Sequence, residues 1–332
     1  MKTVKEIMSN QPTLSICIPT YCRANNLDQC LSTIFAQIGK NPDLLSEIEI
    51  VVSDNASTDN TRLVVEKFIK QYSNITYFIN KENLGCDANY IESVVNSNGK
   101  YAWIIGDDDF ILNGALDYLV KYLKNNILAL YTVQTEKFVD MATVYKKRNY
   151  LENVEHFAPK AHNEFFAKNY CIGLLSSMIF NRQMWLDVDR TGYFVGWSYY
   201  EIALKMIAQS NLPFEHNGAS LVSTMQSCDW IKGGTEFYYF INWNRILKKL
   251  PSFGYNINYV NQILSSFPKK LILMLLRAKA NGLNCKMNDL KMMIDEFYCS
   301  PFYLLLAVII FFVPNSFIKL IRDSRKNINA SA

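Results

Sequence analysis

GKYAWIIGDDD, residues 99–109, contains an apolar segment that ends in three consecutive carboxylates, Asp107 to Asp109. Adjacent like charges repel each other unless a cation or a bound proton relieves them. Where a buried strand ends at the edge of a sheet, its last side chains face the crevice in which α/β proteins bind ligands. Oxygen ligands suit a hard cation such as Mg²⁺ or Mn²⁺, which in turn holds a diphosphate. The stretch therefore predicts a site for a metal and a nucleotide rather than a solvated acidic turn.

Strand and helix signals alternate on both sides of this stretch over the first 130 residues, which predicts βαβ units and a mostly parallel sheet. We expect strands over residues 14–18, 48–53, 75–79 and 101–105. We expect helices over residues 25–38, 87–97 and 114–124, and one that begins after Thr58 or Asp59 and carries Leu63 to Ile69. Farther along the chain, residues 174–180 are typical of a strand and residues 199–210 of a helix.

The loops that follow the first four expected strands carry the polar residues of a nucleotide site. Their sequences are PTYCR (19–23), SDNASTD (53–59), NLGCDAN (83–89) and the acidic triplet. Successive parallel strands end at the same edge of a sheet, so these loops are expected to meet in one crevice. A bound nucleotide needs a carboxylate for its base or ribose, backbone donors, and a metal for its diphosphate. Asp54, the turn at 83–85 and the acidic triplet supply these three parts.

Four motifs in combination, SICIPTYCRANNL, EIVVSDNASTDNT, NLGCDANY and GKYAWIIGDDD, resemble the inverting family 2 glycosyltransferases with a GT-A fold. The resemblance covers residues 14–125 closely. It implies an α/β fold, in which a mostly parallel sheet is flanked by helices and followed by a helical C-terminal extension. The catalytic domain would span residues 1–230, with a nucleotide-sugar-binding half at 14–125 and an acceptor half at 126–230. Residues 231–332 would form the helical, membrane-associating region.

The resemblance also assigns roles to individual residues of this chain. Asp109 would be the direct metal ligand, and Asp107 would face the ribose or a metal-bound water. Asp54 matches the carboxylate that recognises the base. The remaining residues expected to bind the nucleotide sugar are Pro19, Thr20, Tyr21, Arg23, Asn83, Gly85 and Asp108. In the first loop, Cys22 stands where the family usually has Asn, so the role of that side chain is not carried over.

The DxD motif of the family matches Asp107 to Asp109. The general base of the family is usually a carboxylate in a Glu-Asp pair at the start of a helix, beyond the DxD motif. Glu201 in GWSYYEI (196–202) is the candidate here, with Ile202 where the Asp is often found. Asp187 and Asp189 are the alternatives, and a solvated helix residue is the competing interpretation of Glu201. Processive members carry Gln-x-x-Arg-Trp, whereas this chain has QSCDW (226–230), so polymer synthesis is not expected.

The function implied by the resemblance is transfer of a sugar from a nucleotide-diphospho sugar to a lipid-linked oligosaccharide, with Mg²⁺ or Mn²⁺ as cofactor. Within the family the chain looks most like the O-antigen glycosyltransferases of enteric bacteria, including the abequosyltransferase type. The donor would then be CDP-abequose and the pathway lipopolysaccharide synthesis. The expected location is the cytoplasmic face of the bacterial inner membrane, as a peripheral or monotopic protein.

An apolar run near the C-terminus, residues 302–313, is shorter than the ~20 residues that a spanning helix needs. Basic residues follow it at Lys319, Arg322, Arg325 and Lys326. Basic side chains beside an apolar segment suit an anionic lipid surface. The run therefore predicts an interfacial segment, and a buried tail helix is the alternative. Residues 269–279 have the same character.

Composition limits the other classes of function. Half of the 332 residues are hydrophobic, which excludes global disorder, and a net charge of +4 argues against nucleic acid as the main partner. The eight cysteines form no CxxC pair and are expected to be reduced core thiols, and three dispersed histidines suggest no zinc site. The polar residues 1–13 lack the apolar segment of a signal peptide, so we expect a cytoplasmic protein.

Several rival interpretations of the acidic loops fail on the sequence. A haloacid-dehalogenase-like phosphatase needs a later Gly-Asp motif, and Gly106-Asp107 is the only such pair in the chain. The segment 54–65 resembles a calcium loop, but its sixth position is Asp59 and its twelfth is Val65. No GxGxxG or GxxxxGK[ST] string is present, which argues against dehydrogenases and P-loop enzymes. A non-catalytic protein that binds a sugar nucleotide or a membrane partner stays an alternative.

Overall fold

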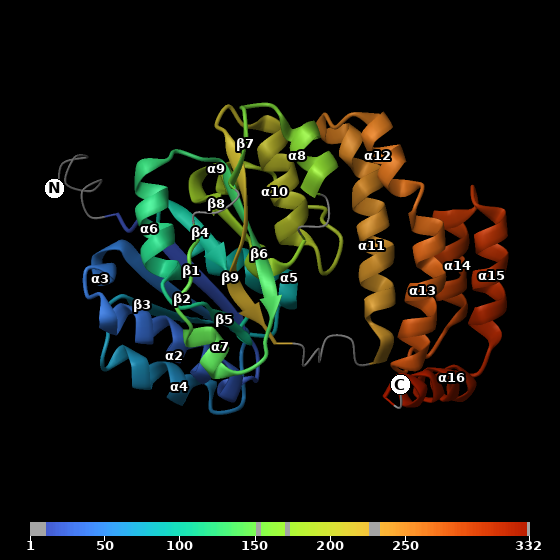
Figure 1. The fold of residues 1–332 in the computed structure, drawn as a ribbon, viewed down its shortest axis with the longest axis horizontal. Helices are drawn as coiled ribbons and strands as arrows, with labels where there is room; N and C mark the ends of the chain where they lie inside the picture. The colour runs from blue at the N-terminus through green and yellow to red at the C-terminus, as the bar shows by residue number, and fades with distance from the viewer. Residues whose placement is uncertain (1–10, 151–153, 170–172, 226–232, 331–332) are drawn as a thin grey trace. The chain divides into compact units, whose positions relative to one another are not determined.

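A computed structural model describes residues 11–150, 154–169, 173–225 and 233–330, with side chains up to residue 323 in the last helix. The chain divides into two compact units, shown in chain order by the colours of Figure 1. The first unit comprises residues 1–193 and 198–226, and the second comprises residues 194–197 and 227–332. Each unit is described by itself.

The first unit is built on a mixed sheet whose strand order is β3-β2-β1-β4-β8-β6-β9-β5, with β7 paired to β9. The four strands β3, β2, β1 and β4 are parallel, as the sequence predicts. β8 runs antiparallel to β4 and β6, and β9 runs parallel to β6. β5 and β7 are antiparallel to β9. The strand bounds are β1 Leu14–Thr20, β2 Ile48–Asp54, β3 Ile75–Ile79, β4 Tyr101–Ile104, β5 Asp109–Ile111, β6 Leu130–Lys137, β7 Val154–Phe157, β8 Met178–Asn181 and β9 Phe214–Thr224.

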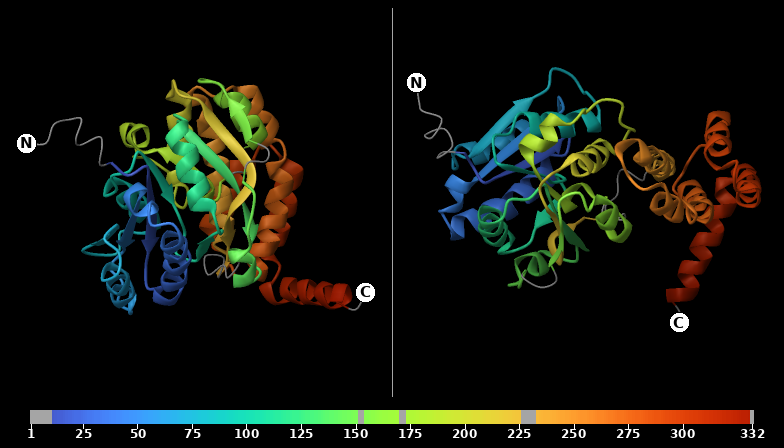
Figure 2. Two further views of the ribbon diagram at one scale, coloured as in Figure 1. Left: turned by 60° about the vertical axis from the view of Figure 1, so that its left-hand side comes forward. Right: turned by 90° about the horizontal axis from the view of Figure 1, so that it is seen from above.

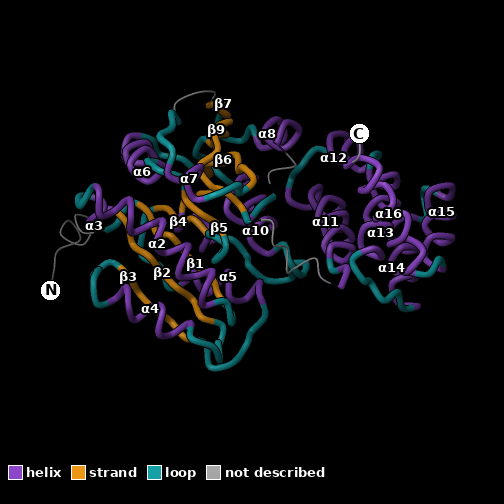
Figure 3. The backbone as a smooth tube through the Cα atoms, turned by 60° about the horizontal axis from the view of Figure 1, so that its bottom comes forward, coloured by secondary structure: helices purple, strands orange, loops and turns teal. Residues whose placement is uncertain are grey.

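Helices cover both faces of this sheet (Figures 1 and 3). One face carries α2, α4 and α6, and the other carries α5, α9 and α10. Their bounds, with those of the shorter helices, are α2 Ala24–Lys40, α3 Leu44–Glu47, α4 Thr61–Ile69, α5 Cys86–Val95, α6 Ala115–Asn125, α7 Met141–Tyr145, α8 His162–Asn169, α9 Arg182–Asp187 and α10 Ser198–Gln209. The first unit is thus an α/β structure with a mixed sheet between helices.

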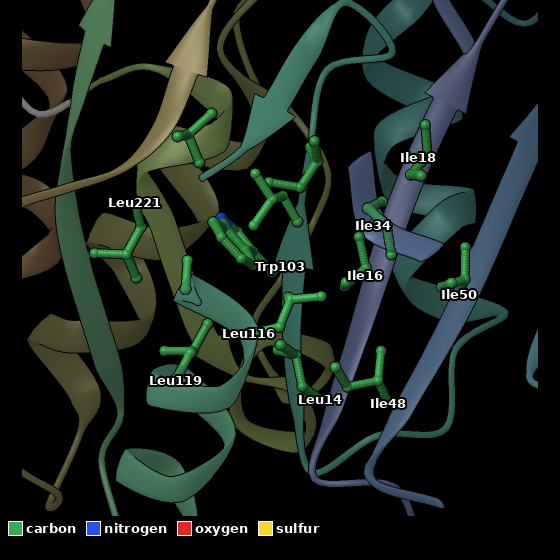
Figure 4. Close-up of a cluster of buried hydrophobic side chains, with 14 of the residues drawn as sticks. Leu14, Ile16, Ile18, Ile34, Ile48, Ile50, Trp103, Leu116, Leu119 and Leu221 are labelled. Atoms are coloured by element: carbon green, nitrogen blue, oxygen red, sulfur yellow. The ribbon is translucent and has the colours of Figure 1, made fainter. Parts of the chain in front are cut away.

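The core explains why the first strands are rich in apolar residues. Leu14, Ile16 and Ile18 alternate along β1 and pack, together with β2 residues, against side chains of α2 and α6 (Figure 4). Cys17 points to the opposite face of the same strand and is also fully buried. A parallel sheet covered on both faces needs apolar residues at nearly every strand position.

One expected strand begins later than predicted. Residues Leu175–Ser177 form a 3₁₀ turn, and the strand β8 covers only Met178–Asn181. The turn is held by the Ser177 N–H, which donates to the Leu174 carbonyl, and by the Trp103 indole, which donates to the Ser176 carbonyl. A hydrophobicity pattern does not reveal such contacts between distant residues.

The second unit is helical, as predicted for the C-terminal region (Figures 1 and 2). Its helices are α11 Glu236–Lys249, α12 Ile257–Leu264, α13 Phe267–Ala280, α14 Met287–Phe297, α15 Pro301–Phe312 and α16 Asn315–Ala330. No single helix in the described part of the chain has the length and apolar character needed to cross a membrane. Pro301–Phe312 and Asn315–Asp323 meet this requirement only as a pair, and they are bent by 100° relative to each other.

Candidate active site

The loops after the parallel strands meet at one edge of the sheet, as the sequence predicts. Thr20 at the end of β1 lies in register with Asp54 at the end of β2, which in turn pairs with Ile79 of β3. The Thr20 hydroxyl donates to Asp107 Oδ2 over 2.7 Å, and the Asn55 N–H donates to the Thr20 carbonyl over 2.9 Å. These contacts join three of the four loops in one site.

Arg23 neutralises two of the three consecutive carboxylates. Its Nη1 lies 2.8 Å from Asp107 Oδ1, and its Nη2 lies 2.5 Å from Asp108 Oδ2. Asp107 is almost completely buried. Burial raises the pKa of Asp107 to about 7, although Arg23 and the Thr20 hydroxyl act in the opposite direction. The first loop thus supplies both a cation and a hydroxyl donor to the acidic triplet.

Asp109 begins the short strand β5 and has a different environment. Its Oδ2 accepts a hydrogen bond from the Ser176 hydroxyl, which itself accepts the N–H of Gly106. Burial raises the pKa of Asp109 to about 7, and the neighbouring carboxylates add to this effect. Within the described residues Asp109 makes no ion pair within 4.0 Å, whereas Asp107 and Asp108 share Arg23.

This donor set fits a divalent cation that is completed by substrate. No group of three His, Cys, Asp or Glu side chains in the described part of the chain is arranged to hold a metal alone. Mg²⁺ usually keeps several waters and takes one or two carboxylates plus substrate phosphates. Asp109 offers one carboxylate without a basic partner, so the cation would need the diphosphate oxygens for the rest of its shell.

Asp54 lies at the end of β2 and is 2% exposed. Its Oδ1 accepts the N–H of Ser57 over 2.8 Å, and its Oδ2 accepts the Tyr77 hydroxyl over 2.5 Å. Burial and the hydrogen bond to Asp54 raise the pKa of Tyr77. Asp54 therefore fixes the loop after β2 through these two hydrogen bonds. A nucleotide would bind to the lone pairs of the carboxylate that the two bonds leave unused. Tyr77 is a partner that sequence reasoning missed.

Asn55 connects the loops after β2 and β3. Its Nδ2 donates to Asn83 Oδ1 over 2.8 Å and to the Gly85 carbonyl over 3.2 Å. Its Oδ1 accepts the N–H of Leu84 over 2.9 Å. Gly85 has a φ of +84°, a conformation that favours glycine. The turn at 83–85 is thus held in shape by Asn55, which sequence reasoning did not single out although it follows Asp54 directly.

Pro19 and Tyr21 complete the first loop. Pro19 is buried within β1, in register with Ser53 of β2. Tyr21 follows the strand, and its side chain is 45% exposed. Its ring is therefore accessible at the same edge as the acidic triplet.

Cys22 takes a left-handed backbone conformation, with a φ of +51°. Its N–H donates to the Ser57 hydroxyl over 2.8 Å, and its Sγ accepts the N–H of Thr58 over 3.4 Å. Hydrogen bonds from the backbone and the side chain of Thr58 lower the pKa of the thiol. Cys17 and Cys30 are buried, as expected for core thiols, whereas Cys22 and Cys86 are half-buried and Cys299 is exposed. Cys171 and Cys228 lie outside the described residues.

We expect Cys22 to react with iodoacetamide faster than Cys17, Cys30 or Cys86, because its thiolate is the more populated and the more accessible. Peptide mass spectrometry after a short exposure measures the rates. A nucleotide sugar with Mn²⁺ should slow alkylation of Cys22 while leaving Cys299 unchanged as an internal control. Equal rates at Cys22 with and without the nucleotide would place the donor away from this loop.

Glu201 lies in the first turn of α10 and is fully buried. Its Oε1 is 3.4 Å from Nζ of Lys205, which also donates to the Asp189 carbonyl over 3.3 Å. The start of α10 is tied to the acidic triplet through residues 173–176, because the Tyr199 hydroxyl donates to the Gly173 carbonyl over 2.6 Å. The alternatives Asp187 and Asp189 have exposed side chains, and residues 226–230 lie outside the described part of the chain.

Comparison with known proteins gives a family and a fold. The model of the family described as glycosyl transferase family 2 matches residues 15–184, which is half of the chain. Abequosyltransferase RfbV of Salmonella typhimurium is 31% identical over 204 residues, which are 58% of this chain and 60% of that protein. The GalNAc(5)-diNAcBac-PP-undecaprenol beta-1,3-glucosyltransferase of Campylobacter jejuni is 32% identical over 111 residues, which are 33% of this chain and 34% of that protein. The chain therefore matches less than two thirds of either relative's length.

Two solved structures are similar over most of the chain. Staphylococcus aureus TarS 1–349 in complex with UDP-GlcNAc superposes with a TM-score of 0.58 at 12% identity, covering 94% of this chain and 92% of that one. The mannosyltransferase PcManGT from Pyrobaculum calidifontis, in complex with GDP-Man and Mn²⁺, gives a TM-score of 0.54 at 15% identity, with 90% and 86% covered. At these identities the likeness concerns the fold, which is that of the GT-A glycosyltransferases.

Proposed function

The chain belongs to glycosyl transferase family 2, and on that premise we propose that it transfers a sugar from a nucleotide-diphospho sugar to a lipid-linked oligosaccharide. We place the reaction in O-antigen or lipopolysaccharide synthesis, with CDP-abequose as the donor and Mg²⁺ or Mn²⁺ at Asp109. The similarity to an abequosyltransferase supports this choice of donor. One observation carries the proposal: Asp109 is a carboxylate without a basic partner among the described residues, beside two carboxylates that Arg23 neutralises.

The proposed reaction is a single displacement at the anomeric carbon. A bond forms between that carbon and the acceptor hydroxyl oxygen, while the bond to the diphosphate oxygen breaks. Glu201 would take the proton of the hydroxyl, and the negative charge would leave with the nucleoside diphosphate. A cation held by Asp109, when bound, would stabilise the charge on that leaving group. Arg23 and Thr20 would keep Asp107 oriented toward the donor.

A screen of donors tests the proposal. We expect a CDP-sugar to raise the melting temperature of the purified protein more than UDP-, GDP- or dTDP-sugars do, and only when Mn²⁺ or Mg²⁺ is present. At a ligand concentration 100 times its Kd, the stabilisation is about 2.7 kcal/mol. Thermal unfolding measured with each nucleotide, with the metal and with EDTA, gives the result. If none of these nucleotides raised the melting temperature with metal present, the proposal would be wrong.

We also propose that the second unit attaches to the membrane surface through α15 and the start of α16. The large side chains Phe302, Leu305, Ile309 and Phe312 are 66%, 60%, 54% and 65% exposed. Their spacing of three and four residues places them on one face of α15. In α16, Phe317, Leu320 and Ile321 are exposed close to Lys319. Apolar side chains beside basic ones suit an interfacial helix on anionic lipid, and the cytoplasmic leaflet of the inner membrane would provide such a surface.

The quadruple variant F302S/L305S/I309S/F312S should bind vesicles that contain phosphatidylglycerol at least about tenfold more weakly than the wild type, because it removes most of the inserted apolar area. Cosedimentation with vesicles measures the change, and circular dichroism checks that the helices persist. The control variant L63S/I127S removes apolar side chains that are 64% and 61% exposed in the first unit. Equal losses in both variants, or no binding by the wild type, would contradict a role of α15.

A further inference from the structure

A cavity of about 730 Å³ lies in the first unit, apart from the residues assigned to the donor. It is bordered by the end of β6, by α7 with the segment that follows it, and by the middle of β9. Figure 1 shows α7 beside the end of β6. The cavity is lined by four basic side chains, which are Lys137, Lys146, Lys147 and Arg148.

An irregular part of β9 forms the floor of the cavity, and the buried side chain of Asn217 holds it rigid. The register between β6 and β9 shifts on both sides of Gln134, and the extra residues of β9 include Gly218 and Ala219. Gly218 has no side chain and Ala219 has only a methyl group, so they leave space that larger residues would fill. Asn217 fixes this bulge: it is fully buried, its Oδ1 accepts the Ala219 N–H over 2.8 Å, and its Nδ2 donates to the Tyr131 hydroxyl over 2.9 Å and to the Tyr150 carbonyl over 2.9 Å.

The positive charge of the cavity is largely uncompensated. Arg148 pairs with Glu136 through two bonds of 2.7 Å each, so these two charges cancel. Lys137, Lys146 and Lys147 are exposed and form no ion pair with any other described residue. The Nε of Arg148 is buried and finds no hydrogen-bond partner in the described structure. Three free ammonium groups and an unused donor in one hollow point to an anion with several charged oxygens.

The cavity also lies at the same edge of the sheet as the acidic triplet. Asp109 of β5 pairs with Thr224 of β9, which in turn pairs with Lys137 of β6. Neighbouring strands are about 4.8 Å apart, so the backbones of Asp109 and Lys137 are separated by about 10 Å. An acceptor whose hydroxyl reaches the donor can therefore extend its anionic end into the cavity.

We propose that this cavity binds the diphosphate of the lipid-linked acceptor, an inference that rests on the proposed function. Lys146 and Lys147 contact the diphosphate oxygens from one side and Lys137 from the other. Val139, whose side chain is 70% exposed at the same cavity, packs against the first part of the lipid chain. The cavity thus distinguishes a diphosphate-linked saccharide from a neutral one.

Direct binding of two probes tests the anion site without catalysis. Inorganic diphosphate and farnesyl diphosphate are titrated into the full-length protein in EDTA, so that no metal-bound diphosphate forms at the donor site. We expect both to bind and to compete with each other, and farnesol to bind much more weakly. The variant K146E/K147E should lower both affinities by about tenfold or more, and higher salt should weaken binding to the wild type.

The charge-matched control is K70E/K121E, which reverses two exposed lysines elsewhere in the first unit and should bind like the wild type. Equal affinity of K146E/K147E and the control for farnesyl diphosphate would overturn the proposal. So would a matching loss of binding to phosphatidylglycerol vesicles, since this would assign the lysines to bulk lipid. If diphosphate binding required the two lysines but no donor were bound or hydrolysed, the anion site would stand and the proposed function would fall.

Discussion

Asp109→Asn is expected to lower kcat for sugar transfer by at least about 100-fold, and Asp109→Ala by about the same factor or more. The carboxylate is the proposed metal ligand, and loss of one group that stabilises the charge of a leaving oxyanion typically costs a factor of about 10²–10³. The amide keeps the shape of the side chain and can still accept the Ser176 hydroxyl, so the fold should persist. Initial rates of transfer over a series of Mn²⁺ concentrations give the result.

The same variant has a second expected effect, on stability without metal. The pKa of Asp109 is raised to about 7 by burial, so ionisation of this group costs more in the folded chain than in the unfolded chain. Its contribution to stability is therefore present at low pH and is lost as the pH rises through about 7. In EDTA the wild type should melt at a lower temperature at pH 8 than at pH 6, with a smaller decrease in Asp109→Asn.

Asp43→Asn is the control for both measurements, because Asp43 is an exposed carboxylate in the same unit. It should leave transfer and the pH dependence of melting unchanged. Metal-dependent transfer by Asp109→Asn within twofold of the wild-type rate would remove Asp109 from the metal site.

The parallel half of the sheet could be predicted because burial on both faces leaves a simple signal. The strands β1, β2 and β4 are buried at every position and mostly apolar, and the loops that follow parallel strands lie at one edge. The antiparallel half could not be predicted in this way. Strand β9 reads FEHNGASLVST, and its buried residues Glu215, His216 and Asn217 form hydrogen bonds with side chains far along the chain. Glu215, for example, accepts the Tyr122 hydroxyl over 2.7 Å.

The candidate site also has a part that could be predicted from the sequence and a part that could not. Convergence of Thr20, Asp54 and the acidic triplet follows from strand order alone. The specific partners do not, because Arg23 meets Asp108 across 85 positions of sequence and Tyr77 meets Asp54 across 23. The burial of Glu201 left no signal in SYYEIALKMIAQ, because Glu201 and Lys205 lie one turn apart on the same side of the helix, a pattern typical of a solvated face.

Glu201→Gln is expected to lower kcat by at least about 100-fold while the KM for the donor changes less than twofold. A general base contributes a factor of about 10²–10⁴ to the chemical step and little to donor binding. Because Glu201 is buried beside Lys205, the same substitution also disturbs an ion pair, and breaking a buried pair costs about 3–5 kcal/mol. Transfer rates must therefore be divided by the folded fraction, measured by circular dichroism at the assay temperature.

Lys205→Met separates the role of Glu201 as a general base from its role as an ion-pair partner, because it breaks the same ion pair but leaves the carboxylate in place. The carboxylate of Glu201 would still be present to accept a proton, so a role in the chemical step would survive the loss of Lys205. We therefore expect the folded fraction of Lys205→Met to transfer sugar within about tenfold of the wild-type rate, whereas the folded fraction of Glu201→Gln is at least about 100-fold slower. If both variants lost stability to the same extent and their folded fractions transferred sugar at the wild-type rate, Glu201 would be only the partner of Lys205. Asp187→Asn and Asp189→Asn would then be the next variants to measure, since both of these carboxylates are exposed in the same unit.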